Sequence, residues 1–307
     1  TDDLLAITSG GRLTDTGTGP LLAFSAGTAN IGNAAGDQLF VVNGAGSQAT
    51  LAGPVLSTAG TALSLPGTAL GEVSTSATLT DASPARLVSL SGGSLTLGSA
   101  ANAFLVNSAG AATLAGGLLD ATGADITGAG DFVRALGGGR LVVIGSSAPL
   151  LSLTGGTHQF GAAGNIYRLS GTATAVDPLS GLVLGTEEPI RAAGSLFESV
   201  GATATTQRAV RLDVALLQAS APLLSLRNNG TVAGSLTTTS NAIDLTSRAR
   251  RNATAPIIAL DGSRITVTNA SLVNVAGGSY LGVTGNLLSV ANGSQISVTG
   301  GTLLFAA

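Results

Sequence analysis

The chain has 307 residues, no cysteine and a formal net charge of −3, and charged residues make up only 9% of it. The absence of cysteine excludes disulfides and thiolate metal sites, and a near-neutral charge provides no field for binding a nucleic acid. All 13 basic residues are arginine, and 45 glycines accompany only 9 aromatic residues. This composition suits a narrow core with tight corners.

Hydropathy alone points toward a membrane, because its mean is +0.47 and two long stretches, Asp37 to Glu72 and Arg86 to Asp120, carry no charge between their ends. Serine, threonine, glycine and asparagine interrupt both stretches every few residues. Neither offers the 18 or more predominantly apolar residues that a spanning helix needs. We therefore expect no membrane insertion.

A strand–turn–strand pattern begins at the N-terminus, where Leu4, Leu5 and Ile7 precede a Gly-Gly turn and Leu13. Similar units follow along the chain: PLLAFSAGT from Pro20, LVSLSGGSLTL from Leu87, FLVNSAGAATL from Phe104, PLLSLTGGTHQF from Pro149 and PLLSLRNNGT from Pro222. Apolar residues alternate within each unit, which is the period of a half-buried strand, and glycine supplies the positive φ of the turn. We predict no long helix.

Two patterns near the middle of the chain contain residue types that catalysis uses. Asp120, Asp125 and Asp131 are the nearest thing to the carboxylate cluster of a carbohydrate-active β-helix enzyme, but they lie in turn-like sequence, where aspartate is an ordinary turn former. No nucleophile elbow accompanies the single histidine, His158, which argues against a catalytic role, and we expect it to be a solvent-facing strand residue. We expect no enzyme, and assign no catalytic residue, metal ligand or cofactor.

Residues 183–217 break the repeat and are predicted to be an irregular or loop-bearing segment. Five charged residues stand out there in a chain with few charges: Glu187, Glu188, Arg191, Arg208 and Arg211. One interpretation is a longer surface loop. The other is a lateral contact or ligand patch, because loops on a rigid scaffold often carry binding.

Three minor patterns lie in the C-terminal third. Arg248, Arg250 and Arg251 are the only basic concentration and are expected to form a solvated loop rather than a nucleic-acid site. Asn-x-Ser/Thr triplets begin at Asn229, Asn252, Asn269 and Asn292, where asparagine is expected for backbone reasons whether or not it is glycosylated. Thr-x-Thr pairs such as Thr203 and Thr205 do not recur at every predicted turn, which argues against an ice-binding face.

The clearest repeat is near the C-terminus: IIALDGSRITV from Ile257, LVNVAGGSYLGV from Leu272 and LLSVANGSQISV from Leu287. Such a unit cannot bury its own apolar face, so copies must stack. We predict an all-β fold, a single elongated β-solenoid (parallel β-helix) over residues 1–307, with about 14–18 residues per turn, roughly 19 turns and a length of roughly 90 Å. The expected core ladder is Ile258, Val273, Leu288 and Leu304, and the expected hydroxyl ladder is Ser263, Ser279 and Ser294.

The two ends look uncapped, since neither offers an amphipathic helix or a polar final repeat. Candidate assembly residues are Thr1, Leu4, Leu5 and Ile7 at one end and Leu303, Leu304 and Phe305 at the other. Unpaired strand edges are templates for another chain, and a head-to-tail contact that does not close makes a fibre. More of the same polypeptide would also cover the ends. A start without methionine is what we expect of a processed chain or part of a longer one.

The units LVSLSGGSLTL, PLLSLTGGT and LLSVANGSQISV resemble the degenerate repeats in the stalks of large secreted bacterial β-helix proteins, the filamentous-haemagglutinin-like adhesins and autotransporter passengers. The resemblance is compositional and transfers no site residue. It implies an extracellular or cell-surface location and the stalk of an adhesin, with cell-surface or matrix glycans as partners. Our first expectation is a structural subunit of a filament, sheath or surface layer, whose partner is another copy of itself.

Overall fold

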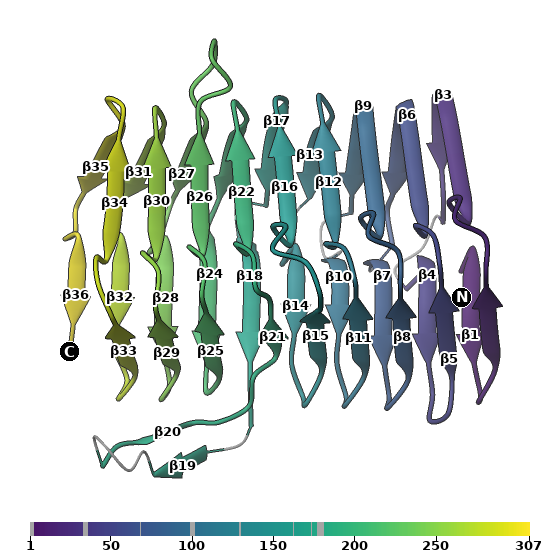
Figure 1. Cartoon of the computed structure of the whole chain (residues 1–307), viewed down its shortest axis with the longest axis horizontal. Coiled ribbons are helices and arrows are strands. Elements are labelled where there is room, and N and C mark those ends of the chain that lie inside the picture. Colours follow the sequence, from purple (N-terminus) through teal and green to yellow (C-terminus); the bar gives the residue numbers. More distant parts are fainter. Residues whose placement is uncertain are drawn as a thin grey trace.

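The computed structural model describes residues 3–32, 36–67, 69–98, 102–128, 130–161, 163–172, 174–176 and 181–307, and Figure 1 shows their arrangement. These residues form 36 strands and no helix. Strands from successive turns pair in parallel, and only the hairpin of β19 and β20 is antiparallel among the described pairs. The predicted all-β solenoid is therefore confirmed.

One full turn of the solenoid contains four strands and two tight arcs. The eighth turn consists of β28 (Ile243–Thr246), β29 (Arg250–Ala253), β30 (Ile258–Asp261) and β31 (Arg264–Thr268). One arc, with positive φ at Ser247 and Arg248, joins β28 to β29, and a second, with positive φ at Gly262, joins β30 to β31. The arcs lie at the lower and upper ends of the strands in Figure 1, and the turns stack along the horizontal axis.

The predicted period was wrong by a factor of two. Ile258 pairs with Leu288, 30 positions away, and Val273 with Leu304, 31 positions away. Elsewhere the offset runs from 27, for Phe197 and Leu224, to 49, for Leu141 and Ile190. The 15-residue unit is thus half a turn, because it contains one arc and each arc reverses the chain, so that two are needed to return to the same sheet. The chain makes about nine turns and, at about 4.8 Å per turn, spans about 45 Å.

Both predicted ladders split in the same way. Ile258 and Leu288 stack in one sheet, while Val273 and Leu304 stack in another. The hydroxyl of Ser294 accepts a hydrogen bond from the backbone N–H of Ser263 (3.1 Å) on the upper arcs, whereas Ser279 accepts one from Ala249 (3.1 Å) on the lower arcs. Alternate copies of the unit therefore form alternate arcs.

Sheet A follows the whole rod with ten strands, and sheets B and E together follow it on the other side of the lower arcs. Sheet A consists of β1 (Leu5–Thr8), β4 (Gln38–Asn43), β7 (Ala69–Ser74), β10 (Asn102–Val106), β14 (Val133–Ala135), β18 (Asn165–Ser170), β24 (Arg208–Asp213), β28, β32 (Val273–Val275) and β36 (Leu304–Ala306). Sheet B consists of β2 (Arg12–Asp15), β5 (Gln48–Leu51), β8 (Thr78–Asp81), β11 (Ala111–Leu114), β15 (Arg140–Val143) and β21 (Ile190–Arg191), and sheet E of β25 (Leu216–Ala219), β29 and β33 (Tyr280–Val283).

Sheet C contains the strands around the upper arcs. The first three turns have long strands that run through the arc, β3 (Leu22–Asn30), β6 (Leu56–Leu65) and β9 (Val88–Leu97). Beyond β9 the sheet divides into two branches. One branch is β12 (Leu119–Thr122), β16 (Leu151–Thr154), β22 (Phe197–Val200), β26 (Leu224–Arg227), β30 and β34 (Leu288–Ala291), and the other is β13 (Asp125–Gly128), β17 (Thr157–Phe160), β23 (Thr203–Thr206), β27 (Ser235–Thr238), β31 and β35 (Gln295–Thr299).

The core is a continuous column of aliphatic side chains, because alternate residues of the strands point inward. Ile258 and Leu260, for example, are buried while Ala259 between them is half-buried. Near the middle of the rod, Phe160 packs between Phe132 and Phe197, with ring centroids 4.8 Å and 6.5 Å away. Narrow layers of this kind depend on aliphatic residues, as the composition indicates.

The main irregularity is a hairpin inserted in the lower arc of the sixth turn. Its strands, β19 (Thr174–Val176) and β20 (Val183–Gly185), project below the rod in Figure 1. Most of residues 190–217 lie instead in the regular strands β21 to β25. The prediction of a loop-bearing segment rested partly on the charges of this region. Charged residues do not distinguish a loop from a strand, because outward-facing strand positions accommodate charge as well as loops do. A second protrusion, above β26, is the arc at residues 228–234.

Candidate functional site

The N-terminal end face has unpaired strand edges on all its sheets. Within the described residues, β1 pairs only with β4, β2 only with β5, and β3 only with β6. Leu4 is 47% exposed and Leu5 is half-buried, while Ile7 is buried. Thr1 lies outside the described residues. This face presents core side chains and backbone groups that have no neighbour on one side.

The C-terminal end face is more apolar and also open. Leu303, Leu304 and Phe305 are 52%, 47% and 46% exposed, and Val290 in β34 is 50% exposed. The last charged residue of the sequence is Arg264, so the ninth turn carries no charge. Charges, prolines and bulges are the usual devices that prevent edge strands from pairing with other chains, and charge is missing here.

The two end strands of sheet A belong to the same ten-stranded ladder. β1 is its first strand and β36 its last. β36 pairs with β32, and the other sheets end one layer earlier, at β33, β34 and β35. The C-terminal face is therefore stepped, with one short strand standing above an otherwise complete ninth turn.

The five residues predicted as a lateral contact do not form one patch. Glu187 lies at the base of the hairpin, where its carboxylate accepts hydrogen bonds from the backbone N–H and the hydroxyl of Thr172 (2.6 and 2.8 Å). Glu188 and Arg191 face a groove beside sheets B and E. Arg208 and Arg211 lie in β24 of sheet A. They are close in the sequence, but between Arg191 and Arg208 the strands β22 and β23 of sheet C carry the chain from sheet B to sheet A.

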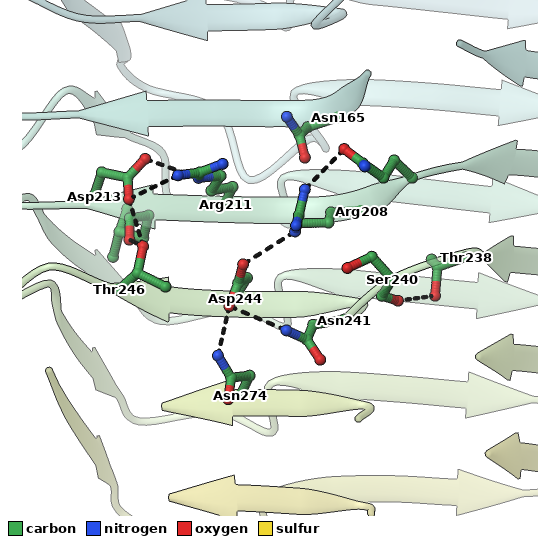
Figure 2. Close-up of polar contacts among 12 residues, drawn as sticks. Asn165, Arg208, Arg211, Asp213, Thr238, Ser240, Asn241, Asp244, Thr246 and Asn274 are labelled. Atoms are coloured by element: carbon green, nitrogen blue, oxygen red, sulfur yellow. Dashed lines mark hydrogen bonds and ion pairs between the residues drawn. The ribbon is translucent and has the colours of Figure 1, made fainter. Parts of the chain in front are cut away.

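Arg208 and Arg211 belong to a polar network on sheet A (Figure 2). Arg208 forms an ion pair with Asp244 (3.0 Å), and Asp244 also accepts hydrogen bonds from Asn274 (2.7 Å) and Asn241 (3.2 Å). Arg211 pairs with Asp213 (2.9 Å), which also accepts a hydrogen bond from the hydroxyl of Thr246. Each carboxylate is thus neutralised by an arginine and by amide or hydroxyl donors. The network joins β24, β28 and β32, so the partners of both carboxylates come from neighbouring strands of the same rod.

The groove is a concave feature that combines several charged and polar side chains. Its volume is about 890 Å³, and it follows the C-terminal ends of β15, β21, β25, β29 and β33. Its polar lining includes Glu188, Arg191, Gln218, Arg250, Asn252 and Tyr280. Burial raises the pKa of Glu188, and the neighbouring Arg191 opposes that rise. The guanidinium carbon of Arg250 lies 5.9 Å from the centroid of the Tyr280 ring.

The structure places His158 and the arginine cluster differently from the sequence-based prediction. His158 is fully buried rather than solvent-facing, because it shares the inward side of β17 with Phe160. Its Nε2 lies 3.0 Å from the carbonyl oxygen of Gly155, and burial lowers its pKa. Arg251 is also fully buried and Arg250 faces the groove, so of the three arginines only Arg248 is an exposed turn residue as predicted.

The three aspartates considered as a carboxylate cluster are on different parts of the turn. Asp120 is in β12, Asp125 is in β13 and Asp131 precedes β14. The Asp131 carboxylate accepts a hydrogen bond from Asn165 (2.6 Å) and pairs with Arg168 (3.5 Å). No group of three or more His, Asp or Glu side chains suited to a metal ion occurs in the part of the chain that the structure describes.

The Thr-x-Thr pairs take a different register once the period is corrected. Thr203 and Thr205 pair with Ser235 and Thr237 on the next turn, and Thr237 pairs with Thr266. These hydroxyls therefore do align on the outside of β23, β27 and β31, although the half-turn period hid the alignment. Asp125 and Arg264 interrupt the adjoining column of outward residues.

Comparison with known proteins leaves the geometry as the main guide to function. No protein-family model matches the chain, and no curated protein matches it. No helix in the described residues is long and apolar enough to cross a membrane.

Proposed function

We propose that this chain is a non-enzymatic structural protein of the cell exterior, a subunit that stacks head to tail into a filament, sheath or surface layer. The observation that carries the proposal is the pair of open end faces, each of which exposes core side chains and unpaired strand edges. A β-solenoid grows by adding strands to such edges, so a second copy is a natural partner for each face.

The energetic basis of stacking is burial of the end layers. Leu287, Leu288, Ile296 and Val298 of the ninth turn pack against the core on one side only and remain partly exposed on the other. Complete burial of a side chain of this kind contributes about 1.5 to 3 kcal/mol, and the ladder hydrogen bonds of the edge strands add to it. Only the surplus over the entropic cost of association appears as affinity.

The stepped C-terminal face indicates how the copies meet. If β1 of the next copy added to β36, sheets B, C and E would be left with a gap of one layer. If β1 instead takes the place of β36 beside β32, then β2 and β3 continue the other sheets without a gap. The second arrangement costs only the pairing of the three-residue β36 and avoids a large cavity, so it is the favoured one.

The proposal is tested by sedimentation velocity of the purified chain over a range of micromolar concentrations. The unmodified chain is expected to form species larger than a monomer as concentration rises. Leu288→Asp, which places a charge on the C-terminal face, is expected to remain monomeric. Thr96→Asp is the matched control, because Thr96 is exposed in the second half of β9, away from both ends. A chain that stays monomeric at all concentrations, or equal assembly of both variants, contradicts head-to-tail stacking.

The second candidate is the stalk of a secreted or surface adhesin. The groove beside sheets B and E favours it, because a stalk with a glycan-binding surface needs a concave polar site and a rigid rod beneath it. An adhesin binds its target as a monomer, whereas a filament subunit acts only after assembly. Binding of the Leu288→Asp monomer to cells or glycans therefore distinguishes the two.

A further inference from the structure

The groove exists because the ladder on that side of the rod is interrupted. Sheet B ends at β21, which has only two residues, and sheet E begins at β25. This break follows the sixth turn, where the inserted hairpin lengthens the spacing between paired residues to between 43 and 49. The chain there is Ala192 and Ala193, and later rungs present Ala219, Ala253 and Gly282 to the same surface. These small residues share the lining with longer polar side chains.

Tyr280 and Gly282 form a flat aromatic surface at one end of the groove. A Cβ atom on Gly282 would lie 2.9 Å from Cε1 of Tyr280 and 3.2 Å from its hydroxyl oxygen. The ring therefore lies along its own strand, directly over Gly282, and any larger residue there would displace it. Arg250, the ladder partner of Tyr280, lies beside the ring. Aromatic rings held in this way offer a face to the C–H groups of a sugar.

The charge of the groove favours an anionic ligand. Its lining contains two arginines, Arg191 and Arg250, and one carboxyl group, Glu188. Glu188 accepts a hydrogen bond from the backbone N–H of Gln218 and lies near Arg191 and Arg140. Planar guanidinium groups bind carboxylates with two parallel hydrogen bonds, and Gln218 and Asn252 supply amide groups for hydroxyls.

We propose that this groove binds a linear glycan that carries carboxylate groups, such as a short polyuronate segment, along the axis of the rod. Arg191 and Arg250 bind sugar carboxylates, and the ring of Tyr280 packs against a sugar face. Successive rungs are about 4.8 Å apart, comparable with the length of one sugar ring, so consecutive sugars meet consecutive strands. Tyr280 and Gly282 belong to β33, the edge strand of sheet E at the C-terminal face, so glycan binding is measured on the Leu288→Asp chain, which we expect not to assemble, and its outcome is read separately from that of assembly.

The test is isothermal titration calorimetry of the Leu288→Asp chain with tetragalacturonate, with cellotetraose as the neutral probe. We expect binding of tetragalacturonate that Arg250→Gln and Tyr280→Ala each weaken at least tenfold. Gly282→Val is expected to weaken it as well, by displacing the ring. Arg12→Gln is the matched control, because Arg12 is an outward residue of sheet B in the first turn, far along the rod from the groove.

Three results would overturn the proposal. One is the absence of binding by the parent chain. Another is equal binding of the charged and neutral probes, which removes the role of the arginines. The third is an equal loss in Arg12→Gln and Arg250→Gln, which indicates non-specific attraction to positive charge. Circular dichroism melting of each variant separates loss of the site from loss of the fold: a variant that is unfolded does not count, and the remaining variants decide.

Discussion

At the scale of single residues, the core contains a charged side chain where an aliphatic one would serve. Arg251 is fully buried in β29, and its ladder partners are Leu217 and Leu281. Its Nη1 donates to the carbonyl of Asn252, whereas its Nε and Nη2 have no hydrogen-bond partner among the residues that the structure describes. Burial lowers the pKa of Arg251 to about 10. An arginine in this position costs stability, because the guanidinium loses its water without gaining a carboxylate.

We predict that Arg251→Met stabilises the rod. Methionine keeps the length of the side chain and removes the buried charge, so the free energy of unfolding should rise by about 1 to 4 kcal/mol. Urea unfolding followed by circular dichroism measures it. Arg264→Met, at an exposed position of β31, is the control and should change little. Destabilisation by Arg251→Met would show that the guanidinium has a favourable role in the core.

A second buried charge gives a pH dependence. Asp81 faces inward in β8 beside Leu51 and Leu114, and burial raises its pKa to about 6, against the opposing effect of a hydrogen bond from the Ser83 N–H. A raised folded-state pKa means that the folded form prefers the protonated acid. Its contribution to stability is therefore fully present below about pH 4 and is lost as the pH rises through 6.

Asp81→Asn is predicted to remove this dependence. The amide keeps the acceptor for Ser83 and carries no charge, so the variant should be about 2 kcal/mol more stable than the parent at pH 7 and similar to it at pH 4. Melting temperatures at both pH values measure the effect. A parent chain whose stability does not fall between pH 4 and pH 7 relative to the variant would contradict the assigned environment of Asp81.

The burial of His158 could have been predicted from the residue pattern of its strand. In the sequence Thr157, His158, Gln159, Phe160, strict alternation puts the histidine on the same face as phenylalanine, and the structure buries both. The strand signal was therefore sufficient to predict a buried histidine, and the preference of histidine for surfaces misled the prediction. No comparable signal marks Arg251, because an arginine at an inward position contradicts the usual rule for burial.

At the scale of elements, strands and arcs were predictable because their causes are local. Alternation defines a strand, and Gly-Gly or Asn-Gly defines an arc. The pairing of strands is not local. LVNVAGGSYLGV and LLSVANGSQISV are nearly interchangeable as sequence, yet one forms a lower arc and the other an upper arc. Each arc reverses the chain, and this geometry, which the sequence of one unit does not show, requires two units per turn. The groove was not predicted because its residues come from several turns, whose stacking depends on the number of units per turn.

The short strand β36 supplies a prediction at this scale. We expect a chain that lacks residues 302–307 to assemble at least as readily as the full chain, because all its sheets then end in the ninth turn and β32 is free to pair with β1 of the next copy. Light scattering at matched concentrations measures the rate. A chain that no longer assembles after this deletion would show that Leu303, Leu304 and Phe305 form the contact themselves.

At the scale of the whole molecule, the described residues form a rod of about nine turns whose sides and ends differ in character. The ion pairs and amides of sheet A satisfy one another within the rod, and the outer strand positions are mostly small and polar. The end faces, by contrast, expose leucine and phenylalanine side chains beside unpaired edges. We propose that this difference between sides and ends directs growth along the axis.

Electron microscopy of the purified chain at micromolar concentration and neutral pH tests that claim most directly. Head-to-tail stacking predicts long, unbranched fibres with an axial repeat of about 45 Å, set by nine turns at the strand spacing. The Leu288→Asp chain should give separate rods of that length. Separate rods from the unmodified chain, or fibres with a repeat near 90 Å and no shorter period, would contradict the account.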